Sequence, residues 1–252
     1  MSEPTVSVVV PVKDGARHLP EQLAALAAEG PDEVLVVDSG SSDDSVALAR
    51  GGGARVLEID PASFGHGRTR NLGAESTSGD VIAFLTQDAT PVAGWLAGLR
   101  SGFALAGDVG AVFGPHLPRP ETSPMIAREL EAFFHSKAAP DGGPRIERAG
   151  GDPWLSNVNA AYWRDCWERL RFADLPYSED QAFGEAMLAA GWAKAYVPAM
   201  AVLHAHDYPP LRFARRYFDE YRGLRATVGH VEPIAPRRAL ADVRGLVAAD
   251  RA

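Results

Sequence analysis

The chain has 252 residues, of which 46% are hydrophobic and 23% are charged. That composition is typical of a soluble globular protein, and the length is enough to bury a substantial core. Acidic residues outnumber basic ones by 33 to 25, a net charge of −8. This balance argues against nucleic-acid binding, whose affinity comes mainly from neutralising phosphates. The single cysteine, Cys166, excludes an internal disulfide and a cysteine-rich metal site.

The N-terminus does not resemble a signal peptide, and no apolar run approaches the roughly 18 residues that a membrane span needs. We therefore expect a cytoplasmic protein. A helix predicted at residues 211–225 is basic and aromatic. Such a segment is typical of a helix lying on anionic lipid and equally of a helix packed on the core. Peripheral contact with the inner membrane face therefore stays an open alternative.

Short apolar runs alternate with helical patterns in the first half of the chain. Strands are predicted at residues 6–12, 33–37, 55–59 and 81–85, and helices at 18–29, 46–50, 68–76 and 95–105. Strands that are apolar throughout and separated by helices predict an α/β fold. Its Rossmann-like sheet should be mainly parallel, with helices on both faces.

The second half is less regular. Residues 115–153 are rich in proline and glycine and predict a long connection around one helix at 126–134. A later apolar strand is predicted at 195–206. We expect one domain over residues 1–252. Its nucleotide-binding half should end near residue 114, its acceptor-binding and catalytic half near 225, and residues 226–252 should form a C-terminal tail.

Polar side chains follow each of the four predicted strands of the first half. They lie at residues 13–14, 38–42, 64–71 and 86–88. Because ligands bind beyond the carboxyl ends of strands in open α/β sheets, we expect a site there. Each group alone also fits helix capping or a turn. Four successive strand ends together favour the site.

The familiar phosphate-binding motifs are absent. The sequence has no dinucleotide-binding glycine fingerprint, no P-loop and no hydrolase nucleophile elbow. An anionic ligand must then be held by other means. Carboxylates are hard oxygen ligands that suit Mg²⁺ or Mn²⁺, and these ions also bind diphosphate oxygens. The sequence therefore predicts one of these two cofactors.

Several motifs resemble those of the inverting family-2 glycosyltransferases, which have the GT-A nucleotide-diphospho-sugar transferase fold. They are residues 6–11 (VSVVVP), 36–43 (VVDSGSSD), 67–73 (GRTRNLG) and 79–85 (GDVIAFL). Other segments are most similar to the bacterial rhamnosyltransferase branch: residues 64–71 (FGHGRTRN), 85–89 (LTQDA), 204–208 (HAHDY) and 216–219 (RYFD). The resemblance extends over about residues 6–223.

The resemblance implies a donor site at the strand ends, for a dTDP- or UDP-linked sugar. The nucleotide- and donor-binding residues that it implies are Pro11, Val12, Lys13, Asp14, Asp38, Ser39, Arg70 and Gln87. Among these, Asp38 would hydrogen-bond the pyrimidine. The family's D-x-D motif is here Thr86-Gln87-Asp88, which lacks the first carboxylate and therefore the ribose contact that this carboxylate makes. Asp88 keeps the metal position.

The resemblance also implies the metal ligands and the base. Asp88 would bind the metal with His204 or His206, which lie two apart on a predicted strand and so share a face. His206 is slightly favoured, but both stay open. Ser178-Glu179-Asp180 is similar to the family's E-D element, in which Asp180 would deprotonate the acceptor hydroxyl. The alternative is that these two acids only begin a helix.

Residues 154–161 (WLSNVNAA) resemble the stretch that approaches the donor sugar and the acceptor. The acceptor- or sugar-binding residues implied are Ser156, Asn157, Asn159 and Glu179. Cys166 is expected to be buried rather than reactive.

The function predicted is a metal-dependent inverting glycosyltransferase. It would move a sugar, with rhamnose as the first choice, to a hydroxyl of a glycan or lipid-linked acceptor in cell-surface glycan synthesis. One alternative is a sugar-phosphate nucleotidylyltransferase, although residues 11–15 lack its glycine- and arginine-rich loop. The other is a non-catalytic carbohydrate-binding descendant.

Overall fold

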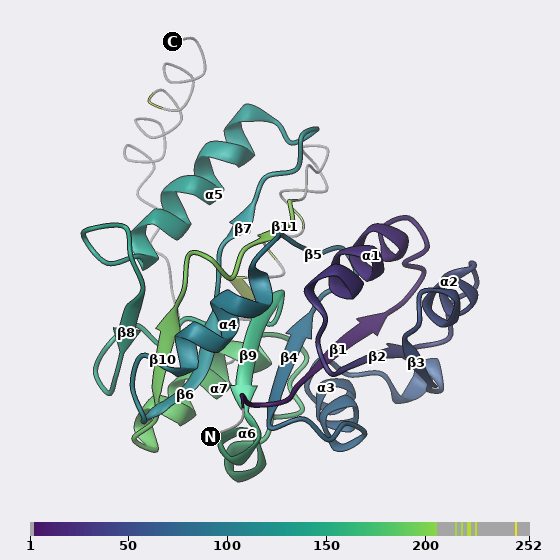
Figure 1. Cartoon of the computed structure of the whole chain (residues 1–252), viewed down its shortest axis with the longest axis horizontal. Helices are drawn as coiled ribbons and strands as arrows, with labels where there is room; N and C mark the ends of the chain where they lie inside the picture. Colours follow the sequence, from purple (N-terminus) through teal and green to yellow (C-terminus); the bar gives the residue numbers. More distant parts are fainter. Residues whose placement is uncertain are drawn as a thin grey trace.

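The computed structural model describes residues 3–205 together with residues 215, 218, 221, 222, 225 and 245. An eight-stranded sheet in the order β3-β2-β1-β4-β9-β6-β10-β8 organises this part of the chain (Figure 1). Its strands are β1 (Val6–Val12), β2 (Glu33–Asp38), β3 (Arg55–Glu58), β4 (Val81–Leu85), β6 (Val109–Phe113), β8 (Arg145–Glu147), β9 (Asn159–Trp163) and β10 (Ala193–Tyr196). A smaller sheet in the order β5-β11-β7 joins β5 (Thr90–Pro91), β7 (His116–Leu117) and β11 (Val202–Leu203).

Helices cover both faces of the large sheet. One face packs against α1 (Leu19–Glu29), α2 (Ser45–Gly51) and α4 (Trp95–Phe103), and its core contains Val8, Val10 and Leu99. The other face packs against α3 (His66–Glu75), α6 (Arg164–Leu170) and α7 (Glu179–Ala189), and its core contains Val9 and Phe84. Successive residues of β1 therefore enter opposite cores, which is why this strand is apolar throughout. Two further helices within residues 3–205 are η1 (Pro61–Ser63), a single 3₁₀ turn, and α5 (Pro124–Lys137).

The sheet combines parallel and antiparallel pairs. β1 is parallel to β2 and β4, and β2 is parallel to β3, so the carboxyl ends of these strands meet at one edge. β9 is antiparallel to both of its neighbours, β4 and β6, while β10 is parallel to β6 and antiparallel to β8. The predicted α/β fold is confirmed. One continuous sheet contains strands from both predicted halves of the chain.

The strand predicted at residues 195–206 is wrong, because the chain forms two short strands in different sheets. The N–H of Val197 donates to Phe113, and the N–H of Met200 then returns to Val197 in a turn. Pro198 has no N–H to continue a ladder, so the chain leaves the large sheet here. It re-forms as β11 in the small sheet. The helix predicted at 211–225 and the tail at 226–252 lie almost entirely outside the described residues.

No helix within residues 3–205 or at the few described positions beyond is both long and apolar enough to cross a membrane.

Candidate active site

The ends of β1 and β4 are tied together by side-chain to backbone hydrogen bonds. The N–H of Lys13 donates to Oε1 of Gln87 at 2.8 Å, and Nε2 of Gln87 donates back to the Lys13 carbonyl at 3.2 Å. Of the residues before Lys13, Val12 is buried and Pro11 is half-buried at the end of β1. Gln87 therefore fixes the loop on which the predicted nucleotide-binding residues lie.

A second tie joins the loops after β1 and β2. The N–H of Ser42 donates to Oδ1 of Asp14 at 2.7 Å, and this bond lowers the pKa of the Asp14 carboxyl. Asp14 has a φ of 51°, in the left-handed region that aspartate tolerates better than most residues. The three strand-end loops therefore form one preorganised edge.

Asp38 closes the turn after β2. It is 2% exposed, and its Oδ2 accepts hydrogen bonds from the N–H groups of Gly40 and Ser41, each at 2.9 Å. Ser39 beside it is also buried, and its hydroxyl has no hydrogen-bond partner among the described residues. The contact of Asp38 with a nucleotide base stays a prediction, and the position of its carboxylate is set by its own turn.

Asp88 and His204 lie together next to this edge. Nε2 of His204 is 3.5 Å from Oδ1 of Asp88, and the two side chains are 12% and 18% exposed. They meet because Asp88 precedes β5, His204 follows β11, and these two strands are antiparallel neighbours. The His204 ring also contacts the ring of His116 on β7, with 5.2 Å between centroids. His206, the other predicted ligand, lies outside the described residues.

The Asp88 and His204 side chains fit a divalent cation in a phosphate site. Such ions usually take one or two carboxylates from the protein and complete their shell with phosphate oxygens and water. Imidazole is a common additional ligand. Among residues 3–205 and the six other described positions, no cluster of three or more histidine, cysteine or acidic side chains could enclose an ion. A site completed by substrate oxygens does not need one.

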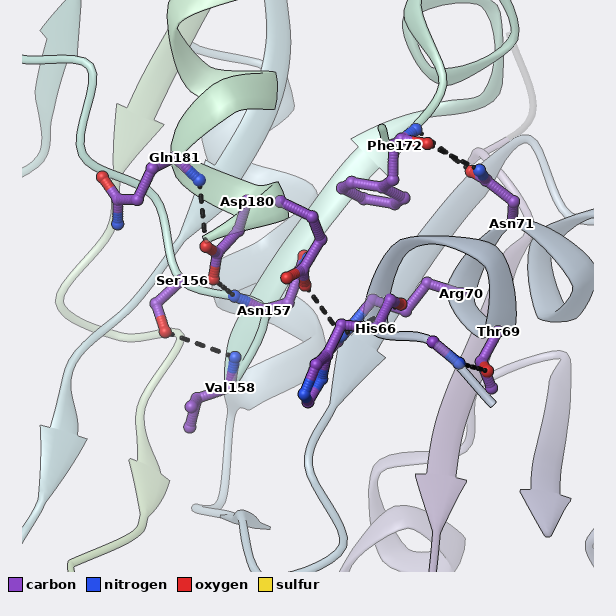
Figure 2. Close-up of polar contacts among 12 residues, drawn as sticks. His66, Thr69, Arg70, Asn71, Ser156, Asn157, Val158, Phe172, Asp180 and Gln181 are labelled. Carbon is purple, nitrogen blue, oxygen red and sulfur yellow. Dashed lines mark hydrogen bonds and ion pairs between the residues drawn. The ribbon is translucent and has the colours of Figure 1, made fainter. Parts of the chain in front are cut away.

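A cavity of about 380 Å³ brings together residues from both halves of the chain. The residues that line it include His66 and Arg70 of α3, Thr86 after β4, the segment Trp154, Ser156 and Val158 before β9, and residues 177–181 at the start of α7. Figure 2 shows His66 and Arg70 on one side of this space and Ser156 and Asp180 on the other.

Asp180 is held by two backbone donors at this cavity (Figure 2). The N–H of Asn157 donates to its Oδ2 at 3.0 Å, and the N–H of Gln181 donates to its Oδ1 at 2.9 Å. Burial, together with the negative charge of Glu179, raises the pKa of Asp180 to about 6. A carboxyl group with a pKa close to neutrality, facing a cavity, is suited to act as a general base.

Glu179 belongs to a buried network instead. Its Oε1 pairs with Nη1 of Arg70 at 2.7 Å, and the two side chains are only 6% and 8% exposed. Nδ2 of Asn157 also donates to Glu179, while the hydroxyl of Tyr162 donates to Oδ1 of Asn157. Arg70 and Glu179, predicted to contact nucleotide and sugar, are thus brought together as an ion pair at the cavity wall. Of these two carboxylates, Asp180 is the one that forms no ion pair with a described cation.

The predicted sugar-binding residues have three different positions. Ser156 lines the cavity, whereas Asn157 is 1% exposed and acts through Glu179 and Asp180. The structure contradicts the predicted sugar contact of Asn159, which is fully buried. Its Oδ1 accepts from the indole of Trp95 at 2.8 Å, and its Nδ2 donates to the Met200 carbonyl at 2.6 Å. Both amide atoms are therefore used inside the core.

Several cavity residues had no individual role assigned from the sequence, among them His66, Trp154 and Tyr177. The signal for His66 was its place between two glycines in a segment that already resembled the rhamnosyltransferase branch. The prediction for Cys166 is confirmed, since the side chain is buried and burial raises the pKa of its thiol to about 12.

The fold and the site together define a GT-A glycosyltransferase. In the mostly parallel sheet, the carboxyl ends of the strands meet at one edge, and a cavity lined by acidic side chains lies beside that edge. Residues 7–166 match glycosyl transferase family 2, and the chain belongs to that family. This assignment makes the chain a glycosyltransferase enzyme. It replaces the nucleotidylyltransferase and non-catalytic alternatives.

Curated relatives agree with this family. The chain is 32% identical over 225 residues to the O-antigen chain rhamnosyltransferase RfbN of Salmonella typhimurium, covering 85% of this chain and 70% of that protein. It is 30% identical over 197 residues to the O-antigen chain rhamnosyltransferase WbaN of Salmonella anatum, covering 75% of this chain and 61% of that protein. The predicted resemblance to the rhamnosyltransferase branch is confirmed.

Solved structures confirm the GT-A fold. The mannosyltransferase PcManGT of Pyrobaculum calidifontis, solved with GDP-Man and Mn²⁺, has a TM-score of 0.69 at 20% identity, covering 94% of this chain and 67% of that one. Glucosyl-3-phosphoglycerate synthase of Mycobacterium tuberculosis, solved with Mn²⁺, UDP and glucosyl-3-phosphoglycerate, has a TM-score of 0.60 at 21% identity, covering 91% and 81%. At these identities the likeness extends to the fold alone.

Proposed function

We propose that the chain transfers a sugar from a nucleoside-diphosphate donor to an acceptor hydroxyl in a single displacement that inverts the anomeric carbon. The observation that carries this proposal is Asp180, a carboxyl with a raised pKa that faces a cavity beside the strand-end edge. Its carboxylate takes the proton of the attacking hydroxyl. The acceptor oxygen bonds to the anomeric carbon as the bond to the diphosphate breaks.

The pairing of Glu179 supports a single displacement. A double displacement needs a second carboxylate free to attack the sugar, and Glu179 is instead bound by Arg70 and Asn157. No covalent sugar–enzyme intermediate follows from this arrangement. Asn157 serves as a positioning residue, because its backbone holds Asp180 while its side chain holds Glu179.

We propose that Asp88 and His204, with His206 as the alternative to His204, hold Mg²⁺ or Mn²⁺. When bound, such an ion supplies positive charge that stabilises the diphosphate leaving group. Support comes from the donor chemistry of Asp88 and His204, which lie 3.5 Å apart, and from GT-A neighbours that were solved with Mn²⁺.

The proposed donor is a dTDP- or UDP-linked sugar, with rhamnose as the first choice, and the proposed acceptor is a glycan or lipid-linked hydroxyl at the cytoplasmic face of the membrane. Support for rhamnose comes from the two O-antigen chain rhamnosyltransferases related to this chain. Neighbours of the same fold were solved with GDP-Man, UDP and UDP-GlcNAc. The fold alone therefore does not select the base.

The decisive experiment compares native protein with Asp180→Asn. Binding of dTDP-rhamnose, UDP-glucose, UDP-GlcNAc and GDP-mannose with Mn²⁺ identifies the preferred donor. Transfer to octyl glycosides is then followed by nucleoside-diphosphate release and product NMR. The variant keeps the side-chain shape but not the proton acceptor, so transfer should fall by roughly two to four orders of magnitude. Donor affinity should change little, and the product should have inverted configuration.

Asp174→Asn is the matched control, since Asp174 lies in the segment before α7 and its exposed carboxylate pairs with Arg68 outside the cavity. This control should transfer sugar at close to the native rate. If Asp180→Asn instead lost donor affinity and kept its turnover at saturating donor, Asp180 would be a binding residue and the proposed mechanism would fail.

A further inference from the structure

His66 presents an uncommitted imidazole to the cavity. It is the first residue of α3 and lines the same cavity as Asp180, so part of its surface is open to solvent and part is covered by the cavity wall (Figure 2). Neither ring nitrogen has a hydrogen bond to any described residue. Desolvation, helped by the positive charge of Arg70 and opposed by Glu179, lowers the pKa of His66. A neutral imidazole donates one hydrogen bond and accepts another.

The glycines on either side allow the chain to hold His66 in this place. A Cβ on Gly67 would overlap the carbonyl oxygen of Ala173, which belongs to the segment leading to α7. A Cβ on Gly65 would overlap the side chain of Arg68. Because backbone cannot yield as a flexible side chain can, any larger residue at Gly67 would separate α3 from that segment.

Two further contacts fix His66. The ring of Phe64 packs edge-on against the imidazole, with 5.2 Å between centroids and 74° between planes. The carbonyl of His66 accepts a hydrogen bond from Nη1 of Arg70 at 3.3 Å. The imidazole is thus oriented by its neighbours and leaves both nitrogens available to a ligand.

Arg70 adds unused donors on the same wall. Its Nη1 is occupied by Glu179, whereas Nε is buried without a hydrogen-bond partner and Nη2 makes no hydrogen bond with the described residues. Nε and Nη2 form one edge of the planar guanidinium, and such an edge can donate two parallel hydrogen bonds. Thr86 also lines the cavity, and its Oγ1 is buried without a hydrogen-bond partner in the part of the chain that the structure describes. Unpaired buried polar atoms are rare in proteins and point to a missing ligand.

The charges around the cavity favour a neutral ligand. Among its described lining residues, Arg70 carries a positive charge, while Glu179 and Asp180 are acidic. Once Asp180 is ionised, negative charge is in excess, and a phosphate or carboxylate placed here would be repelled. Hydroxyl groups can use the same donors and acceptors without that repulsion. Trp154 and Tyr177 supply apolar surface for the carbon face of a ring.

We propose that His66, together with the free edge of Arg70, binds hydroxyls of the neutral sugar being transferred and so selects the donor. This inference rests on the proposed function. Thr86 lines the cavity and stands two residues before Asp88. A sugar joined to a diphosphate at Asp88 would therefore extend into the cavity, toward the acceptor hydroxyl at Asp180. That position makes His66 a specificity-determining residue for the donor sugar rather than for the acceptor.

The test is a pair of calorimetric titrations with Mn²⁺ present, one with the preferred nucleotide sugar and one with its bare nucleoside diphosphate. His66→Phe keeps a ring against Phe64 but removes both nitrogens, whereas His66→Gln restores a donor and an acceptor. Because one hydrogen bond is lost, His66→Phe should weaken the nucleotide sugar about five- to tenfold relative to the nucleoside diphosphate. His66→Gln should recover part of that preference. The control His135→Phe, at an exposed position of α5, should have none of these effects.

Equal weakening of both ligands in His66→Phe would show a disturbed nucleotide site and overturn the inference, as would an unchanged ratio of affinities. A rise in acceptor KM with an unchanged ratio would place the acceptor against His66 and also overturn it. The inference would also be overturned if native protein bound the nucleotide sugar no more tightly than the nucleoside diphosphate, because the sugar would then add no affinity. The ratio of affinities is measured without turnover, and only the acceptor KM requires it, so a failure of the Asp180→Asn test is distinguishable from a failure here.

Discussion

Glu179 and Asp180 are adjacent acids whose surroundings give them separate roles. Glu179 has a buried cation in Arg70, while Asp180 has backbone N–H donors and the cavity. Where two carboxylates lie together, the one without its own cation holds its proton to higher pH. The side chain that cannot pair is therefore the one suited to accept a proton from a substrate.

The pH dependence of transfer should follow Asp180. Only the carboxylate form accepts a proton, so kcat/KM should rise with pH through about 6. Glu179→Gln removes the negative neighbour and leaves Arg70 unpaired, and both changes favour the ionised form of Asp180. The acidic limb of the pH–rate profile should therefore move to lower pH. Glu185→Gln, on the exposed side of α7, is the control. If the acidic limb had the same midpoint in Glu179→Gln as in native protein, the charge of Glu179 would not influence the pKa of Asp180.

Titration of Asp180 should also affect stability, but with the opposite sign: the free energy of unfolding should fall over the pH range in which kcat/KM rises. The folded chain keeps the Asp180 proton to about pH 6, whereas an ordinary aspartate loses it near 3.8. Between these values the folded state binds more protons, so stability falls as pH rises. Asp180→Asn does not titrate, and from pH about 4 to 7 its unfolding free energy should gain roughly 1–3 kcal/mol relative to native protein. Urea unfolding at both pH values measures this. A constant difference would mean that the pKa is not raised.

At the residue scale, the sequence predicted where the site lies better than it predicted which side chains in the site bind to one another. Parallel strand ends meet at one edge, so the positions of Asp88 and Lys13 follow from the fold pattern. The role of Asn159 could not be foreseen, because its partners Trp95 and Met200 are 64 and 41 residues away in sequence. The ion pair of Arg70 with Glu179 spans 109 residues and was hidden for the same reason.

At the scale of elements, predictability followed composition. β1, β2 and β4 are runs rich in valine, isoleucine and leucine and were predicted, whereas β9 reads NAAYW and was not. β11 has two residues and is a strand only because β5 and β7 lie on either side. Strands that depend on distant partners carry little local signal.

The close approach of Gly114 to the turn before β11 gives an element-scale test. Gly114 directly follows β6, and a Cβ there would overlap the carbonyl of Met200, in the turn that leads to β11 and His204. Gly114→Ala should push that segment away, lower stability by about 1–3 kcal/mol and weaken Mn²⁺ binding. Gly107→Ala, whose Cβ would meet nothing within 4 Å, is the control. Thermal unfolding and a Mn²⁺ titration decide, and native values for both in Gly114→Ala would show that the turn does not position His204.

At the scale of the whole molecule, the strand-end edge of the sheet and the cavity beside it bring together residues from distant parts of the chain. Asp88 lies in the first half, and His204 and Asp180 lie in the second, so a bound donor would add further links between elements of the two halves. Nucleotide sugar with Mn²⁺ at 100 times its Kd should add about 2.7 kcal/mol of stability. For a chain of this size, that raises the unfolding midpoint by roughly 5–10 °C.

Differential scanning fluorimetry with Mn²⁺ or with excess chelator tests this link. In Asp88→Ala, the nucleotide sugar with Mn²⁺ should raise the unfolding midpoint no more than the nucleotide sugar with chelator does in native protein. An equal shift of native protein in both buffers would remove the metal from the proposed site.

The antiparallel strand β9 has a consequence for how the chain can be made and divided. During synthesis β1 to β4 can pair as they emerge, but both sheet neighbours of β6, namely β9 and β10, come later in the chain. A fragment ending at residue 114 would leave β6 without a partner and the β4 edge open to pairing with other chains. We therefore expect that the first half of the chain, cut at residue 114, would not form a soluble module by itself. A chimera that joined this first half to the second half of another chain would need a strand in the place of β9 to close the sheet.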